Sequence, residues 1–147
     1  MDHHFILRVV AKMLMPPIML YALYVQFHGD FGPGGGFQAG VIFAVAFILY
    51  GLVFGLDSLR RVVPPAIVRA GIALGTLLYA GTGIYSFFKG KNYLDYSALA
   101  DADNPVAGQH LGILLVEAGV GLTVASVMIA VFVAFAARAP EIKDTDW

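Results

Sequence analysis

The sequence predicts an all-α integral membrane protein with four transmembrane helices, on the grounds of its composition and the lengths of its apolar runs. Of the 147 residues, 59% are hydrophobic and 13% are charged, with a mean hydropathy of +0.79. Soluble domains carry about 25% charged residues, so this chain is unusually apolar. The alternation of apolar and polar residues that is typical of a membrane β-barrel is absent from the sequence. We therefore expect one membrane domain over residues 1–147.

Each of four apolar runs is long enough to cross a bilayer. A spanning helix needs about 20 predominantly apolar residues, and the runs cover approximately residues 6–27, 37–55, 66–88 and 111–137. The first run does not resemble a removable signal peptide, because Asp2 precedes it, Lys12 interrupts it and no small-residue cleavage site closes it. We expect this run to stay in the membrane, with the long side chain of Lys12 reaching back toward the nearer surface.

The distribution of basic residues predicts that both termini face the cytoplasm. In that orientation seven of the nine basic residues lie on or near the cytoplasmic side, and only Lys89 and Lys91 lie outside. This bias agrees with the positive-inside rule. We therefore expect a multi-pass protein of a prokaryotic inner membrane whose N-terminus and C-terminus are both cytoplasmic.

The connections between the runs do not suggest a second domain. Residues 56–65 are short, basic and end in two prolines, which stop one helix and start the next, so we expect the second and third spans to form an antiparallel hairpin. The longest connection, residues 89–109, mixes acidic, aromatic and aliphatic residues. This pattern is compatible with a short amphipathic segment at the outer interface.

Several kinds of chemistry find no support in the sequence. Without cysteine there is no disulfide, thiolate nucleophile or cysteine-based metal site. His28 and Asp30 could ligate a metal, but a third ligand is missing from their loop. No serine, histidine and acid arrangement indicates nucleophilic catalysis, and no basic surface with interleaved aromatic residues indicates nucleic-acid binding. We expect a protein that is not an enzyme and that needs no cofactor or metal.

The most distinctive segment is a glycine-rich turn between the first two spans, residues 27–40. Pro33 is followed by Gly34, Gly35 and Gly36, and Phe37 then opens the next apolar run. These residues disfavour a helix, because glycine costs about 1 kcal/mol and proline about 3 kcal/mol relative to alanine. The turn lacks the lysine and hydroxyl residue of a phosphate-binding loop, and no βαβ unit surrounds it. Irregular backbone near membrane depth is tolerated only beside protein or water, so we expect a neighbouring subunit or an aqueous vestibule there.

Glu117 is the one acid well inside any of the four apolar runs. It lies about six residues into the fourth run, roughly 9 Å below its outer edge at 1.5 Å per residue. A charge at the bilayer centre costs about 3 kcal/mol on insertion scales, so the residue needs a partner or water. Two interpretations remain open: a hydrogen-bonded glutamate that joins helices, or a station on an ion or proton path. His110 lies on nearly the same helix face, roughly 10 Å nearer the outside, and is either an interfacial histidine without a special role or part of that path.

Two blocks of the sequence resemble the MnhB/MrpB family, one of the small-subunit families of the multi-subunit Na+/H+ antiporters. The first is Gly-Pro-Gly-Gly-Gly-Phe-Gln-Ala-Gly at residues 32–40, and the second is Gly-Ile-Leu-Leu-Val-Glu-Ala-Gly-Val-Gly-Leu-Thr-Val at residues 112–124. The resemblance covers nearly the whole chain. It implies a small subunit of a hetero-oligomeric complex that exchanges Na+ for H+, in which large subunits move the protons and small subunits help to assemble the complex and shape its cation route.

The resemblance also marks individual residues. Pro33 and Phe37 match the family signature, whereas the histidine that many relatives carry three residues before the proline is replaced by Asp30, so the role of that histidine is not carried over. The transport or assembly candidates are Pro33, Gly34, Gly35, Gly36, Phe37, Asp30, His28, Glu117 and His110. Two other functions remain open: a structural subunit of a hydrogenase-type membrane complex, and a self-sufficient homo-oligomeric channel or carrier, although no inverted repeat supports the latter.

Overall fold

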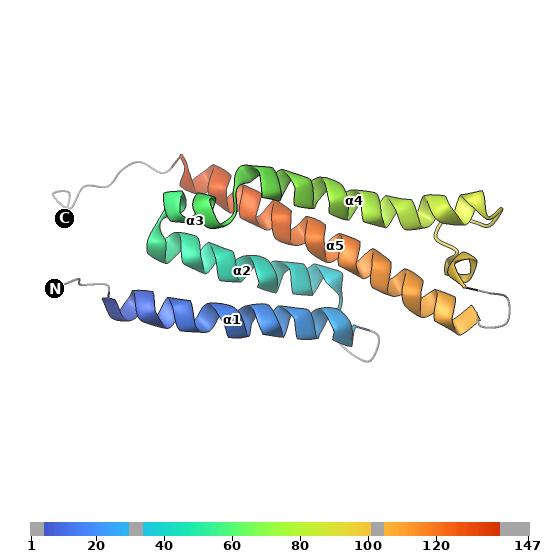
Figure 1. Cartoon of the computed structure of the whole chain (residues 1–147), viewed down its shortest axis with the longest axis horizontal. Helices are drawn as coiled ribbons and strands as arrows, with labels where there is room; N and C mark the ends of the chain where they lie inside the picture. The colour runs from blue at the N-terminus through green and yellow to red at the C-terminus, as the bar shows by residue number, and fades with distance from the viewer. Residues whose placement is uncertain (1–4, 30–33, 101–104, 139–147) are drawn as a thin grey trace.

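The computed structural model describes residues 5–29, 34–100 and 105–138, and all regular structure within these ranges is helical. Four of the helices are long and apolar enough to cross a membrane: α1 (Phe5–His28), α2 (Gly36–Phe54), α4 (Pro65–Phe88) and α5 (Pro105–Ala136). These helices lie side by side along one direction (Figure 1). The predicted all-α architecture with four apolar spans is thus confirmed.

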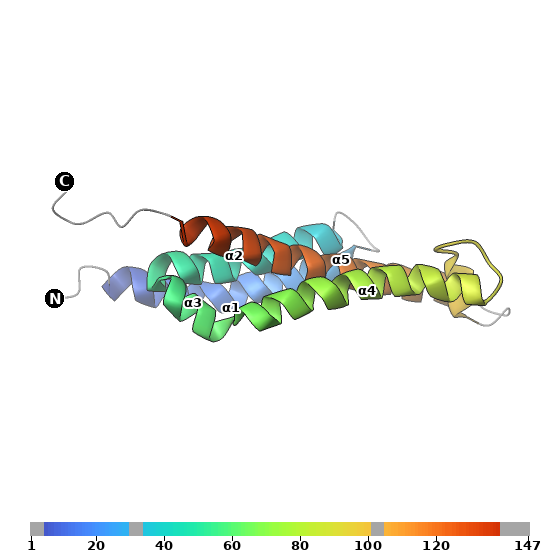
Figure 2. The ribbon, with the colours of Figure 1, turned by 90° about the horizontal axis from the view of Figure 1, so that it is seen from above.

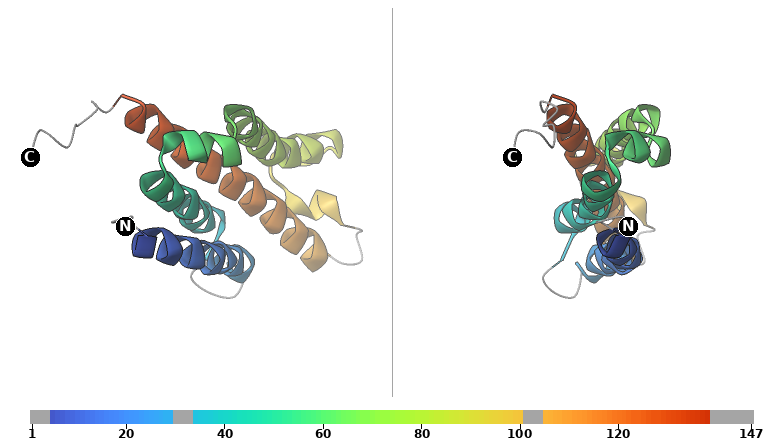
Figure 3. Two further views of the ribbon diagram at one scale, coloured as in Figure 1. Left: turned by 60° about the vertical axis from the view of Figure 1, so that its left-hand side comes forward. Right: turned by 90° about the vertical axis from the view of Figure 1, so that its left-hand side faces the viewer.

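Helix α5 occupies the centre of the arrangement. It packs against α2 on one side and against α4 on the other, while α1 packs mainly against α2. The order across the molecule is therefore α1, α2, α5, α4 (Figure 3). The expected hairpin between the second and third spans is wrong, because the chief neighbour of α4 is α5 rather than α2.

The connection between α2 and α4 explains this difference. It contains a short helix, α3 (Leu56–Val62), which carries the chain from the end of α2 across to the start of α4 (Figure 2). Gly55, between α2 and α3, has a φ of 87°, a conformation that favours glycine. Pro64 caps the start of α4 and Pro65 is its first residue, a position that proline suits. Leu59 of α3 is only 1% exposed and anchors this corner.

Small residues make the closest contacts between helices. A methyl group added at Gly40 of α2 would lie 2.6 Å from the carbonyl oxygen of Gly121 on α5, and one added at Gly75 of α4 would lie 2.6 Å from that of Gly119. Such residues let helix backbones approach closely. Many large apolar side chains point outward instead, as Phe135 does at 76% exposure. This burial pattern fits a protein whose surface meets lipid tails or other subunits.

The connection between α4 and α5 folds back onto the ends of these helices. It contains η1 (Tyr96–Leu99), one turn of 3-10 helix, where we expected a short amphipathic segment. The buried hydroxyl of Ser86 donates a hydrogen bond to the carbonyl oxygen of Asp95 at 3.1 Å. The ring of Tyr96 covers Gly112 of α5, and burial there raises the pKa of Tyr96. The connection is therefore a docked part of the fold.

Candidate functional site

Glu117 and the glycine-rich turn, which are far apart in the sequence, are neighbours in the structure. A methyl group added at Gly29 would lie 2.9 Å and 3.0 Å from the two carboxylate oxygens of Glu117. One added at Gly35 would lie 3.3 Å from Oε1, and one added at Gly36 would overlap the backbone carbonyl of Glu117. The two sequence blocks that suggested a family thus form one site, in which glycine leaves room for the glutamate.

The backbone of the turn is held close to the end of α1. The N–H of Gly35 donates to the carbonyl oxygen of Val25 at 3.3 Å, and a methyl group at Gly34 would lie 2.8 Å from that same oxygen. Gly35 is the N-cap of α2 and has a φ of 123°, a backbone conformation that residues other than glycine rarely adopt. The glycines therefore serve both the conformation of the turn and its close contacts.

The turn is recessed from one end of the molecule. From Pro105 to Glu117 the rise of 1.5 Å per residue gives about 18 Å along α5. Figure 1 shows α4, α5 and η1 extending beyond the end of α1 and the start of α2. Gly29 and Gly35, on the two sides of the turn, lie toward the same end of the helices as Lys89, as the sequence led us to expect, but beside Glu117 rather than level with the start of α5.

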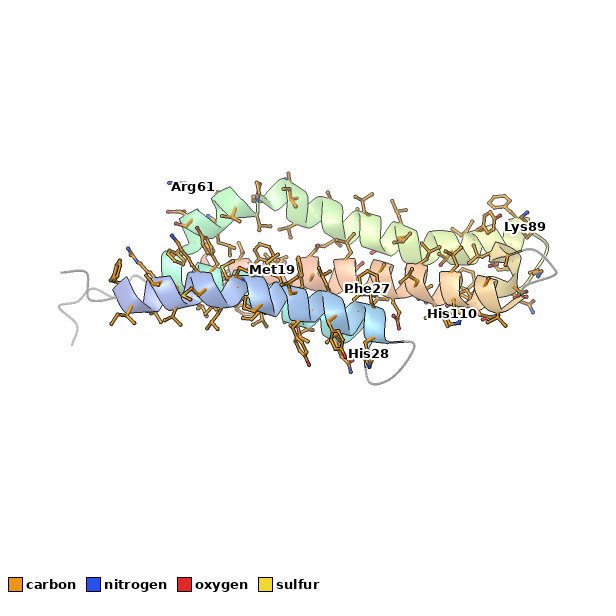
Figure 4. The ribbon with its side chains drawn as sticks, turned by 60° about the horizontal axis from the view of Figure 1, so that its bottom comes forward. Met19, Phe27, His28, Arg61, Lys89 and His110 are labelled. Carbon is orange, nitrogen blue, oxygen red and sulfur yellow. The ribbon has the colours of Figure 1, made fainter. Side chains whose placement is uncertain are left out.

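The two candidate histidines have different surroundings. His28 ends α1 and is half-buried, and its ring stacks on Tyr24 with centroids 5.0 Å apart. Tyr24 in turn stacks on Tyr21 at 6.2 Å, so aromatic rings form a row along one face of α1. His110 is exposed on α5 and lies nearer the end marked by Lys89 (Figure 4). The seven residues between His110 and Glu117 correspond to roughly 10 Å along the helix.

The remaining candidates divide into described and undescribed residues. Phe37, in the first turn of α2, is 64% exposed, so its ring faces the surroundings of the chain. Asp30 and Pro33 lie outside the described residues, and their roles stay predictions. Within the described ranges, no group of three or more histidine, aspartate or glutamate side chains could hold a metal ion.

Gln26 and Gly29 belong to this site although the sequence did not single them out. Nε2 of Gln26 is buried and has no hydrogen-bond partner among the described residues, and a methyl group at Gly121 would lie 2.7 Å from Oε1 of Gln26. An amide inside an otherwise apolar run was the available signal for Gln26. The glycine directly after His28 was the signal for Gly29, and it was overshadowed by the triplet that follows.

Gln26 also borders a large apolar cavity. The cavity has a volume of about 650 Å³ and lies between α1 and α4, with α2, α5 and the end of α3 completing its walls. Phe43 and Phe47 of α2 and Leu122 of α5 are among its apolar lining residues, and Ser126 is one of its few polar ones. Since α1 and α4 each pack on other helices, this space is open between them.

The opposite end of α1 has its own polar contact. Nζ of Lys12 lies 5.2 Å from the centroid of the Phe54 ring, at the last residue of α2. Phe54 stacks on Tyr50 with centroids 4.6 Å apart. A cation over an aromatic ring at a helix C-terminus is favourable on both counts, so Lys12 has a protein partner as well as a short way to the surface.

Comparisons with known proteins agree with these features. A family model described as a domain related to the MnhB subunit of the Na+/H+ antiporter matches residues 6–130. Antiporter subunit mnhB2 of Staphylococcus haemolyticus (strain JCSC1435) is 34% identical over 135 residues, which cover 90% of this chain and 94% of the relative. Subunits of the same name from Staphylococcus epidermidis (strain ATCC 12228 / FDA PCI 1200) and Staphylococcus aureus (strain Newman) are each 33% identical over 132 residues, covering 88% of this chain and 92% of the relative. The region that the family model matches includes both the turn and Glu117.

Proposed function

The chain belongs to the MnhB family of Na+/H+ antiporter subunits, and from this premise we propose that the turn and Glu117 are the part through which it contributes to exchange. The protein is a multi-pass subunit of a multi-subunit antiporter complex in the cell membrane. Its relatives are named as transporter subunits and not as enzymes. The contact between the Glu117 carboxylate and the turn carries the proposal.

The chemistry of this contact supports a role in exchange. Glu117 is the only acidic residue among the described residues of the four candidate spans. An ionisable group inside a membrane protein is expensive, and its usual justification is a buried partner or a path for ions. Here the carboxylate lies beside irregular backbone, which itself requires covering protein or water. We infer that this region helps to shape the cation route of the complex and to hold the chain within it.

Other subunits are proposed to cover α1 and the cavity beside it. Only 11% of the most apolar stretch of α1 is buried within this chain, compared with 28% for α2 and α5. A helix with so little intrachain contact has a large surface left for partner subunits or lipid.

The orientation of the chain follows from its basic residues. We propose that the end of the molecule marked by Arg61 in Figure 4 faces the cytoplasm and that the end marked by Lys89 faces outward. Because the chain has no native cysteine, Lys91→Cys and Arg61→Cys can be labelled one at a time in intact cells with a membrane-impermeant maleimide. Labelling of Lys91→Cys alone is expected, and labelling of Arg61→Cys alone would reverse the orientation.

The test of function uses the whole antiporter complex with a tag on this chain. Na+-dependent proton movement in everted vesicles is compared for Glu117→Gln, Pro33→Ala and the control Asp57→Asn, which alters an exposed acid on α3. We expect exchange to fall about tenfold in Glu117→Gln, equivalent to about 1.4 kcal/mol, with the control unchanged. Co-purification of the other subunits separates loss of assembly from loss of exchange. If Glu117→Gln and Pro33→Ala both assemble and transport normally, the proposal is wrong.

A second experiment distinguishes a subunit, which works only within the complex, from a carrier that works alone. The complex lacking this chain is expected to lose exchange, and the chain alone in liposomes is expected to be inert. Na+/H+ exchange by liposomes that contain only this chain would instead support a self-sufficient homo-oligomeric carrier. Co-purification with hydrogenase subunits would support the hydrogenase-type complex.

A further inference from the structure

We propose that Glu117 is the positioning residue of the glycine-rich turn, and that its carboxylate occupies the side-chain space that Gly29 and Gly35 leave empty. This inference rests on the proposed function for its link to exchange, but the structural coupling can be tested separately. It assigns one physical cause to two features of the sequence, the glycine-rich turn and the intramembrane acid.

Residue 117 meets both sides of the turn. Gly29 directly follows α1 and Gly35 directly precedes α2, and the missing side chains of both would point at the same carboxylate. A methyl group at Gly29 would also lie 3.2 Å from Cα of Gly35, so the two sides of the turn are close to each other. A single carboxylate on α5 therefore limits the position of the end of α1 and the start of α2.

The carboxylate also lies where a helix N-terminus benefits from one. Helix α2 begins at Gly36, and its N-cap, Gly35, has no side chain with which to cap the first N–H groups. The oxygen Oε1 lies 3.3 Å from the position that a Cβ of Gly35 would take. A negative group near the N-terminus of a helix is stabilising because the helix dipole is positive there. Glu117 thus places a carboxylate from α5 beside the N-terminus of α2.

The backbone of residue 117 reinforces this contact. A side chain at Gly36 would overlap the carbonyl oxygen of Glu117 and come within 2.8 Å of its carbonyl carbon. The start of α2 therefore contacts both the backbone and the carboxylate of Glu117 on α5. We infer that Glu117 fixes where the hairpin of α1 and α2 sits along α5.

Three glycines of the turn are expected to respond differently to alanine. A methyl at Gly29 meets the far end of the flexible Glu117 side chain, which can move away, so Gly29→Ala should displace the carboxylate while the fold survives. Gly35→Ala is strained whatever its neighbours are, because its φ is 123°. Gly36→Ala collides with backbone that no side-chain change can remove. Shortening residue 117 can relieve only the contact between the Gly29→Ala methyl and the carboxylate. The 3.2 Å contact of that methyl with Cα of Gly35 stays and needs a shift of a few tenths of an ångström.

The experiment is a double-mutant cycle in the assembled antiporter. Exchange and the thermal dissociation midpoint of the complex are measured for Gly29→Ala, Glu117→Asp and the double variant. Gly35→Ala and Gly35→Ala/Glu117→Asp are the matched controls. We expect Gly29→Ala to lower exchange roughly tenfold, since misplacement of a functional group by about 1 Å can cost up to about a hundredfold. Adding Glu117→Asp should restore exchange to within about twofold of Glu117→Asp alone, and should restore the midpoint, because contacting residues are not additive. Gly35→Ala should not be rescued.

The two readouts distinguish the inference from the proposed function. Rescue of the dissociation midpoint without any effect on exchange would keep the positioning role and remove its link to transport. Multiplicative effects of Gly29→Ala and Glu117→Asp on both readouts would overturn the inference. It would equally be overturned if Gly29→Ala equals the wild type on both readouts, or if Glu117→Asp rescues Gly35→Ala as well as Gly29→Ala.

Discussion

Replacement of Gly75 by alanine tests how closely α4 and α5 must approach. The added methyl would lie 2.6 Å from the carbonyl oxygen of Gly119 and 2.8 Å from the amide nitrogen of Thr123, whereas ordinary contacts begin at 3.4 Å. The helices would have to separate by about 0.8 Å at this level, since both atoms are backbone. The methyl would also overlap Oγ1 of Thr123, whose hydroxyl donates to the Gly119 carbonyl oxygen at 2.9 Å.

Three contributions determine how Gly75→Ala changes the free energy of unfolding. Overpacking costs about 1–3 kcal/mol, and loss of the Thr123 hydrogen bond costs about 0.5–1.5 kcal/mol. The better helix propensity of alanine offsets these costs by up to about 1 kcal/mol. Gly75→Ala should therefore destabilise the chain by about 0.5–4.5 kcal/mol. The control is Gly81→Ala on the same helix, because an added methyl there meets nothing within 4 Å and leaves only the favourable propensity.

The assay is unfolding of the purified full chain in mixed micelles of increasing SDS content, followed by far-UV circular dichroism. The midpoint of Gly75→Ala should shift to lower SDS, while that of Gly81→Ala should stay equal or rise. Equal midpoints for the two variants would refute the argument that glycine sets the distance between α4 and α5.

Three further predictions concern the other contacts of the chain. The carboxylate of Asp95 accepts hydrogen bonds from the hydroxyl and the N–H of Ser97, and these bonds lower the pKa of Asp95. The stabilisation of η1 by these bonds is therefore fully present above the ordinary pKa of 3.8, and it is lost as the pH falls through the lower pKa of the folded state. NMR titration of the Ser97 amide should show a midpoint below 3.8 that disappears in Asp95→Asn, and a midpoint at or above 3.8 would contradict this sign. Lys12→Met and Phe54→Leu should show a coupling free energy of about 0.5–1 kcal/mol in a double-mutant cycle of unfolding. A coupling of zero would show that the cation–π contact does not stabilise the chain. Tyr93→Ala should make the chain between α4 and α5 more sensitive to protease, because its ring covers Gly83, and unchanged digestion would show that the ring is dispensable.

The sequence predicted the helices better than it predicted their neighbours. Runs of apolar residues fix the length of a membrane helix, because hydrocarbon excludes any backbone that is not hydrogen-bonded internally. The choice of neighbours depends on which small residues meet, and glycine spacing is too frequent in this chain to identify pairs. The prolines at the start of α4 were recognised, but the seven-residue helix α3 before them was not, and it places α4 on α5 instead of α2.

The candidate site was predicted as two separate features. Glu117 was recognised from the cost of a charge in a membrane, and the turn was recognised from its glycines, but no periodicity connects residues of α5 with a turn between α1 and α2. The distance between Glu117 and Gly29 depends on the tertiary packing of α2 against α5. Gly29 was overlooked for the same reason, because its requirement for glycine comes from a side chain far away in sequence.

The position of α1 relative to α5 depends on contacts that the chain makes at few places. Helix α1 packs mainly on α2, burying Ala11, Ala22 and Val25, and most of its other surface is exposed within this chain. At one end Lys12 meets Phe54, and at the other the turn meets Glu117. A partner protein that presses on α1 would therefore act on the turn directly, because α1 ends at His28, next to Gly29. We therefore expect a change on the surface of α1 to reach Glu117 through Gly29, the residue that follows this helix.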